Sequence, residues 1–152
     1  MASRAEEVPR SPRGLHPTVL GAVVLPGVEP AVAQVRRYAR ALLGSGFPEL
    51  YELTVVASEL FTNAVRHSRP GSRAGGDTAG PVTVTFLADE DHLRLEIADQ
   101  GGAGSPRLRE PDDNGESGRG LHVVEALCLA WGSERRGRLT VVWAEFALHP
   151  PA

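Results

Sequence analysis

The sequence predicts an α+β fold with two layers, in which helices cover one face of a mixed, mostly antiparallel sheet. Two segments space their apolar residues as amphipathic helices do, and two others alternate apolar and polar residues as strands do. The predicted order is strand, helix, helix, strand, strand, long irregular segment, helix, strand, strand. The 152 residues, 41% of them apolar, are enough for one domain with a core.

The first part of the chain predicts one strand and two helices. Residues 1–16 are rich in Pro, Ser and charge, so we expect a disordered tail before a single domain at 17–152. A strand is predicted at 18–25, closed by Pro-Gly. A helix at 30–43 has Pro in its first turn and Gly after its end. A second helix is predicted at 48–67.

The rest of the chain predicts a loop, paired strands and one more helix. A Gly/Ser/Pro-rich loop at 69–81 precedes the two alternating strands. Their apolar faces are Val82, Val84 and Phe86, and Leu93, Leu95 and Ile97. Residues 100–117 form a predicted lid. A third helix is expected from about Leu121, followed by a strand at 139–148 paired with a short one at 133–136. The expected core residues of this helix are Val123, Val124, Leu127 and Trp131.

Composition excludes several classes of protein. All 16 basic residues are arginines, so a Walker-type phosphate loop, a eukaryotic-type protein kinase and Schiff-base chemistry are excluded, since each needs a lysine. The net charge of −3 gives no reason to expect nucleic-acid binding. No apolar run is long enough for a membrane span or a secretory signal. The single Cys128, expected to be a small buried hydrophobic residue, suits a reducing cytoplasm.

One polar row on the second predicted helix could hold a chemical site. Glu59, Asn63 and His67 follow each other at steps of four, so they share one helix face at the edge of its apolar arc. A carboxylate can act as a general base, and a carboxamide oxygen can ligate Mg²⁺. The alternative is the polar rim of an ordinary amphipathic helix. His67 could simply interact with the C-terminal end of the helix dipole.

Three further signals are individually weak. Asp99 has the parity of its strand's apolar face and precedes a Gly-Gly pair, so it could accept a hydrogen bond from a ligand amine or cap a turn. The Gly118-Arg119-Gly120 run could open an anion-binding helix start or form a hinge. Thr140 could offer a hydroxyl from the last strand, although a β-branched residue needs no such explanation there.

Together, the order and spacing of these signals resemble the GHKL ATPase superfamily. The segments SELFTNAVRHS and ESGRGLHVVEAL are most similar to the anti-sigma-factor serine kinases and to the ATP-binding regulators of high-GC bacteria. The resemblance covers residues 18–148. It implies a cytoplasmic protein that uses ATP and Mg²⁺ to phosphorylate a serine on an antagonist protein. A sigma factor is a further implied partner, and a homodimer is compatible with the resemblance.

The resemblance also implies roles for individual residues. Glu59 would be the general base, Asn63 the Mg²⁺ ligand, and Asp99 the acceptor for the adenine amino group. The remaining implied nucleotide contacts are Gly101 beside the adenine, Gly118 and Gly120 around the triphosphate, Thr140 at the adenine end, and Arg119 and His67 at the phosphates.

Two departures from the family pattern keep other functions open. Ala103 stands where many members have the last glycine of the first glycine box, with Gly104 after it. Glu116 stands where sporulation-type switch kinases have a basic residue. These favour a non-catalytic module that binds ATP and a partner. A histidine-kinase-type domain acting in trans is a second alternative, and a structural protein without a ligand is a third.

Overall fold

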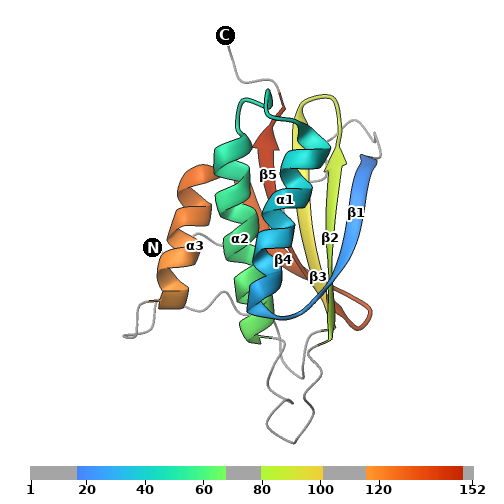
Figure 1. Ribbon diagram of the computed structural model, residues 1–152, viewed down its shortest axis with the longest axis vertical. Helices are drawn as coiled ribbons and strands as arrows, with labels where there is room; N and C mark the ends of the chain where they lie inside the picture. Colours follow the sequence, from blue (N-terminus) through green and yellow to red (C-terminus); the bar gives the residue numbers. More distant parts are fainter. Residues whose placement is uncertain (1–16, 68–79, 101–115, 149–152) are drawn as a thin grey trace, which may run out of the picture.

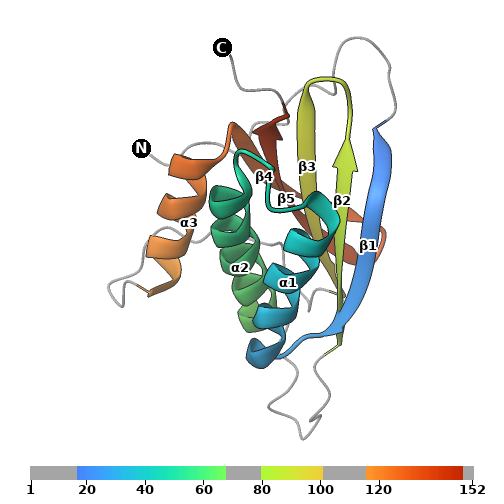
Figure 2. The same ribbon diagram turned by 45° about the horizontal axis from the view of Figure 1, so that its top comes forward.

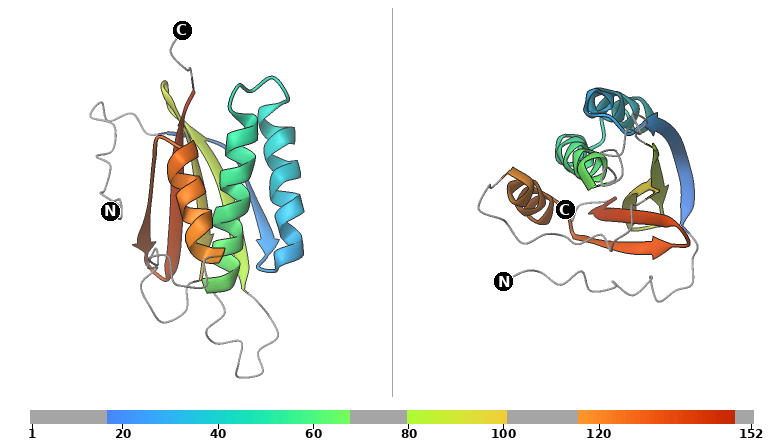
Figure 3. Two further views of the ribbon diagram at one scale, coloured as in Figure 1. Left: turned by 90° about the vertical axis from the view of Figure 1, so that its left-hand side faces the viewer. Right: turned by 90° about the horizontal axis from the view of Figure 1, so that it is seen from below.

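A computed structural model describes residues 17–67, 80–100 and 116–148, which form an open five-stranded sheet with helices on one face (Figures 1 and 3). The sheet order is β1-β2-β3-β5-β4, and neighbouring strands are antiparallel. The strands are β1 (Thr18–Pro26), β2 (Pro81–Ala88), β3 (His92–Asp99), β4 (Ala130–Arg136) and β5 (Leu139–Ala147). The helices are a 3₁₀ turn (Glu29–Ala31), α1 (Val32–Leu43), α2 (Leu50–His67) and α3 (Glu116–Leu127).

The alternating strands bury one face as predicted, because successive side chains point to opposite sides of a strand. The fully buried residues of the two central strands are Val82, Val84 and Phe86 on β2 and Leu93, Leu95 and Ile97 on β3. Helix α2 packs against this face between α1 and α3, as Figure 2 shows. Gly44, with φ of 80°, ends α1 in a backbone conformation that residues other than glycine rarely adopt. In the described part of the chain, no helix is long and apolar enough to cross a membrane.

The third helix differs from the prediction at both ends. Helix α3 begins at Glu116, inside the predicted lid, and ends at Leu127, so Trp131 lies on β4 and not on the helix. A short apolar run after a helix fits a strand as well as another helical turn, and the N–H of Leu129 bonds to Glu145 of β5 at 2.8 Å. Val123 was predicted in the core but is 37% exposed, whereas Val124 is fully buried.

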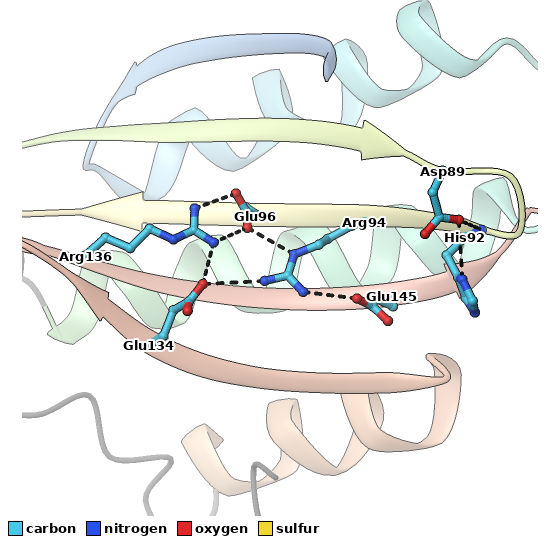
Figure 4. Close-up of polar contacts among 7 residues, drawn as sticks. All are labelled: Asp89, His92, Arg94, Glu96, Glu134, Arg136 and Glu145. Carbon is cyan, nitrogen blue, oxygen red and sulfur yellow. Dashed lines mark hydrogen bonds and ion pairs between the residues drawn. The ribbon is translucent and has the colours of Figure 1, made fainter. Parts of the chain in front are cut away.

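The opposite face of the sheet carries a network of charges across β3, β4 and β5 (Figure 4). Arg136 donates to both oxygens of Glu96 at 2.9 and 2.6 Å. Arg94 pairs with Glu96 and Glu145, each at 3.0 Å, and both arginines also contact Glu134. The guanidinium of Arg94 lies 4.3 Å from the centre of the Trp143 ring. The network therefore links three neighbouring strands.

Removing the charge of Glu96 should destabilise the protein at neutral pH. Burial raises the pKa of Glu96, but hydrogen bonds and charge from Arg136 and Arg94 outweigh burial, so its pKa lies below the ordinary 4.5. A carboxyl group whose pKa is lower in the folded state than in the unfolded state stabilises the fold at pH values above its unfolded-state pKa. This contribution is lost as the pH falls through its folded-state pKa. We expect Glu96→Gln to lower the free energy of unfolding by about 1–2 kcal/mol at pH 7, since Arg136 is partly exposed.

Urea unfolding at pH 7 and at pH 3 measures this contribution. The difference between Glu96→Gln and the unmodified chain should shrink at pH 3, where the unfolded carboxylate is protonated. The exposed Glu90 offers a matched control, and Glu90→Gln should have little effect at either pH. Equal losses for the two variants at pH 7 would contradict the role given to the network.

Candidate functional site

Five elements bring the predicted polar residues to one end of the molecule. The end of α2, the end of β3, and the starts of β2, β5 and α3 lie together there, as Figure 1 shows. This arrangement follows from the topology, because α2 and β3 run toward this end while β2, β5 and α3 leave it. The C-terminal end of α2 and the buried strand end at Asp99 therefore lie at the same end of the molecule.

Helix α2 supplies the first pair of site residues. Glu59 and Asn63 are half-buried, and they border fully buried residues such as Leu60 and Phe61. This confirms the predicted position at the edge of the apolar arc. The two side chains are one turn apart on the same face, so a ligand at this end could meet both. His67 is the last residue of α2, and its side chain lies outside the described part of the structure.

Asp99 ends β3 with its side chain on the helix-covered face, as predicted. It is 4% exposed, and burial raises its pKa from 3.8 to about 6. None of the ion pairs between described residues involves Asp99. Burial disfavours the charged form of a carboxyl group unless hydrogen-bond donors surround it. Asp99 is therefore a carboxylate whose charge would be stabilised by a hydrogen-bond donor on a ligand.

Thr140 lies directly across from Asp99. The two are register partners between β5 and β3, and on the other side Val82 of β2 pairs with Asp99. Thr140 is 5% exposed and shares the helix-covered face. A hydroxyl and a carboxylate thus stand side by side at the end of the apolar face, with the fully buried Val82 next to them. This combination suits a flat, mostly apolar ligand with an amino group at one edge.

Helix α3 approaches α2 at Gly120. A Cβ added to Gly120 would overlap Oε2 of Glu59 and lie 3.3 Å from its Cδ. The sequence predicted both residues in one site but not this contact, because residues 61 positions apart leave no periodic signal. Gly118 and Arg119 lie on α3, and the side chain of Arg119 is outside the described part of the structure. Gly101, Ala103 and Gly104 are outside it altogether.

The donor atoms fit a magnesium ion that arrives with a ligand. The described residues contain no group of three or more His, Cys, Asp or Glu side chains that could hold a metal. Mg²⁺ in phosphate-binding sites usually has one or two protein ligands, with phosphates and waters completing the octahedron. The carboxamide oxygen of Asn63 is a suitable hard donor for such an ion. A metal held by protein side chains alone does not fit these residues.

The chain is similar in sequence to known proteins. Residues 26–146 match the family model of the histidine kinase-like ATPase domain. The chain is 30% identical over 115 residues to the serine-protein kinase RsbW of Bacillus pumilus, spanning 68% of this chain and 69% of that protein. It is 30% identical over 95 residues to RsbW of Listeria monocytogenes, spanning 55% of this chain and 57% of that protein.

A solved structure has the same fold. The crystal structure of the RsbU and RsbW domains of Rv1364c from Mycobacterium tuberculosis superimposes with a TM-score of 0.59 and 20% identity. The match covers 87% of this chain and 34% of that one. At this identity the likeness concerns the fold, and it agrees with the two-layer α+β class predicted from the sequence.

Proposed function

Because the chain belongs to the histidine kinase-like ATPase family, we propose that it binds ATP with Mg²⁺ and transfers the γ-phosphoryl group to a serine of an antagonist protein. The observation that carries the proposal is that the end of α2, which bears Asn63 one turn after Glu59, lies at the same end of the molecule as the buried pair of Asp99 and Thr140. Together these residues would supply a base, a metal ligand and an adenine contact. The proposal also agrees with the name of the RsbW relatives, which are serine-protein kinases.

The adenine end of the site would be Asp99 with Thr140. The adenine amino group donates a hydrogen bond, and a buried carboxylate accepts it strongly because the bond is charge-assisted. Guanine presents an oxygen at the corresponding position, which would face the carboxylate with no proton between them. A ligand that leaves a buried polar group of the protein without a hydrogen-bond partner binds much more weakly, and this difference is a strong source of specificity. Asp99 would therefore favour ATP over GTP.

The phosphate end of the site would be Asn63 and Glu59. Asn63 would hold Mg²⁺, which when bound neutralises phosphate charge and orients the phosphoryl group. Glu59 would accept the proton of the serine hydroxyl. The serine oxygen then forms a bond to the γ-phosphorus, the bond from that phosphorus to the β–γ bridging oxygen breaks, and ADP leaves. Gly101, Gly118, Arg119, Gly120 and His67 are further proposed contacts around the nucleotide.

The proposed partners follow from the same reaction. The acceptor is the antagonist protein, which presents an exposed serine. A sigma factor is a further proposed partner, which this chain would hold or release according to whether that serine is phosphorylated. We also propose the cytoplasm as the compartment, with support from the single Cys128, which leaves no internal disulfide to form. A homodimer is proposed as the assembled form.

Removing the carboxamide of Asn63 should weaken nucleotide binding only when Mg²⁺ is present. We expect Asn63→Ala to raise the Kd for ATP at least about tenfold in Mg²⁺, equivalent to about 1.4 kcal/mol, because a direct ligand is lost. In EDTA the variant and the unmodified chain should bind alike. Titration calorimetry measures the Kd for ATP in Mg²⁺ and in EDTA. Thr62→Ala on the same helix is the control. Equal weakening in EDTA would contradict the ligand assignment.

Incubation with γ-labelled ATP and a candidate antagonist tests the reaction itself. The proposal predicts acid-stable label on a serine of the antagonist. Label that is lost in acid and lies on a histidine would instead support a histidine-kinase-type domain. Nucleotide binding without transfer to any acceptor would support a non-catalytic module. No thermal shift with ATP, ADP or GTP, with or without Mg²⁺, would contradict every nucleotide-based function.

A further inference from the structure

We propose that Gly120 is a positioning residue for Glu59, acting through the absence of its side chain. This inference rests on the proposed function, because it concerns the base of the same reaction. Gly120 is buried where α3 meets α2, and a Cβ at this position would occupy the space taken by Oε2 of Glu59. The backbone of α3 therefore forms one wall of the space that holds the Glu59 carboxylate.

The two helix backbones on either side of this contact are both anchored. On α3, Val124 lies one turn after Gly120 and is fully buried. On α2, Val56 lies three residues before Glu59 and Leu60 follows it directly, and both are fully buried as well. Moving either helix would disturb packing in the core, which is costly because protein interiors are close-packed. The helix spacing at Gly120 is thus set by the core and not by the site.

The Glu59 carboxylate is the part that can move. The atoms that a Cβ at Gly120 would meet are Oε2, Cδ and Cβ of Glu59, with Cδ at 3.3 Å and Cβ at 3.9 Å. The carboxylate is the far end of a flexible side chain, so a rotation would relieve the overlap at little cost to the fold. A methyl group at position 120 should therefore leave the protein folded while displacing the base. Displacement of about 1 Å can cost about a hundredfold in rate.

Gly132 and Gly46 provide useful contrasts. A Cβ at Gly132 would lie 2.8 Å from Cζ2 of Trp143, a rigid and buried ring that cannot turn away cheaply, so Gly132→Ala should destabilise the fold. A Cβ at Gly46 meets no atom of the described chain within 4 Å, and its φ is ordinary. Gly46→Ala is therefore a matched control with the same chemical change and no contact.

The test is a double-mutant cycle with saturating Mg·ATP and the serine-bearing antagonist. Gly120→Ala should lower the transfer rate at least about tenfold, whereas Gly46→Ala should leave it unchanged. In a Glu59→Ala background, Gly120→Ala should have no further effect, because it acts through the carboxylate already removed. An equal loss in both backgrounds would overturn the inference, because the methyl group would then act independently of the Glu59 carboxylate. No loss in either background would overturn it too.

A second readout needs no transfer. Carbon-detected NMR of the Glu59 side-chain carboxyl should show a changed chemical shift in Gly120→Ala and no change in Gly46→Ala. An unchanged Glu59 signal in Gly120→Ala would overturn the positioning role whatever the kinetics. If the unmodified chain transfers no phosphoryl group but the Glu59 signal shifts as expected, the proposed reaction fails while the contact stands.

Discussion

Asp99→Asn should yield a protein that is more stable at pH 7 yet binds ATP at least about tenfold more weakly. Burial raises the pKa of Asp99 from 3.8 to about 6. The folded state therefore binds this proton more tightly than the unfolded state, and the fold loses stability as pH rises from 3.8 through about 6. At 1.36 kcal/mol per pKa unit, the charged form costs up to about 3 kcal/mol at pH 7.

Asparagine has nearly the same shape without the charge, so it removes this cost. We expect a gain of about 1–3 kcal/mol in the free energy of unfolding at pH 7, the lower figure allowing for imperfect hydrogen bonding of the buried amide. The gain should shrink toward pH 4, where the carboxyl is protonated in the folded state. The loss of affinity has a separate cause, because a neutral amide accepts the adenine proton less strongly than a carboxylate.

Urea unfolding across pH 4 to 8 and calorimetric titration with ATP measure the two effects of Asp99→Asn. The exposed Asp91 offers the control, and Asp91→Asn should change neither quantity appreciably. A variant with unchanged stability at pH 7 would show that burial does not penalise the charge. Unchanged ATP affinity would remove Asp99 from the adenine contact.

Glu59→Ala should reduce phosphoryl transfer by about 10²–10⁴-fold while largely sparing ATP binding. A positioned general base contributes about this much to a rate, and the other groups that hold the nucleotide remain. The single-turnover rate at saturating Mg·ATP is the quantity to compare. Glu52→Ala, on the first turn of the same helix, is the control and should transfer normally. Transfer by Glu59→Ala at the unmodified rate would contradict the base assignment.

The parts of the fold that could be predicted from sequence are those with a strong period. Helix α2 and strands β2 and β3 bury one face each, and simple alternation assigns that face. The same alternation placed Asp99 on the buried side, since a strand keeps its parity to its last residue. The antiparallel pairing of Asp99 with Thr140 then follows once β3 and β5 are neighbours.

The features that could not be predicted depend on contacts between distant segments. The start of α3 was missed because its first five residues contain two glycines, which are poor helix formers. Trp131 was assigned to the helix because a short apolar run carries no clear period. The pairing of Arg94 with Glu145, 51 residues away, and the contact of Gly120 with Glu59 depend on tertiary packing. No local pattern in the chain encodes either contact.

Calorimetric titration of the full chain with ATP and GTP, in the presence and absence of Mg²⁺, tests the central claim most directly. The site described here predicts one ATP bound per chain, tighter binding in Mg²⁺, and GTP bound at least about tenfold more weakly. Asp99→Asn should abolish most of the preference for ATP. No heat of binding at millimolar ATP, or equal affinity for ATP and GTP, would contradict the claim that these residues form an adenine-nucleotide site.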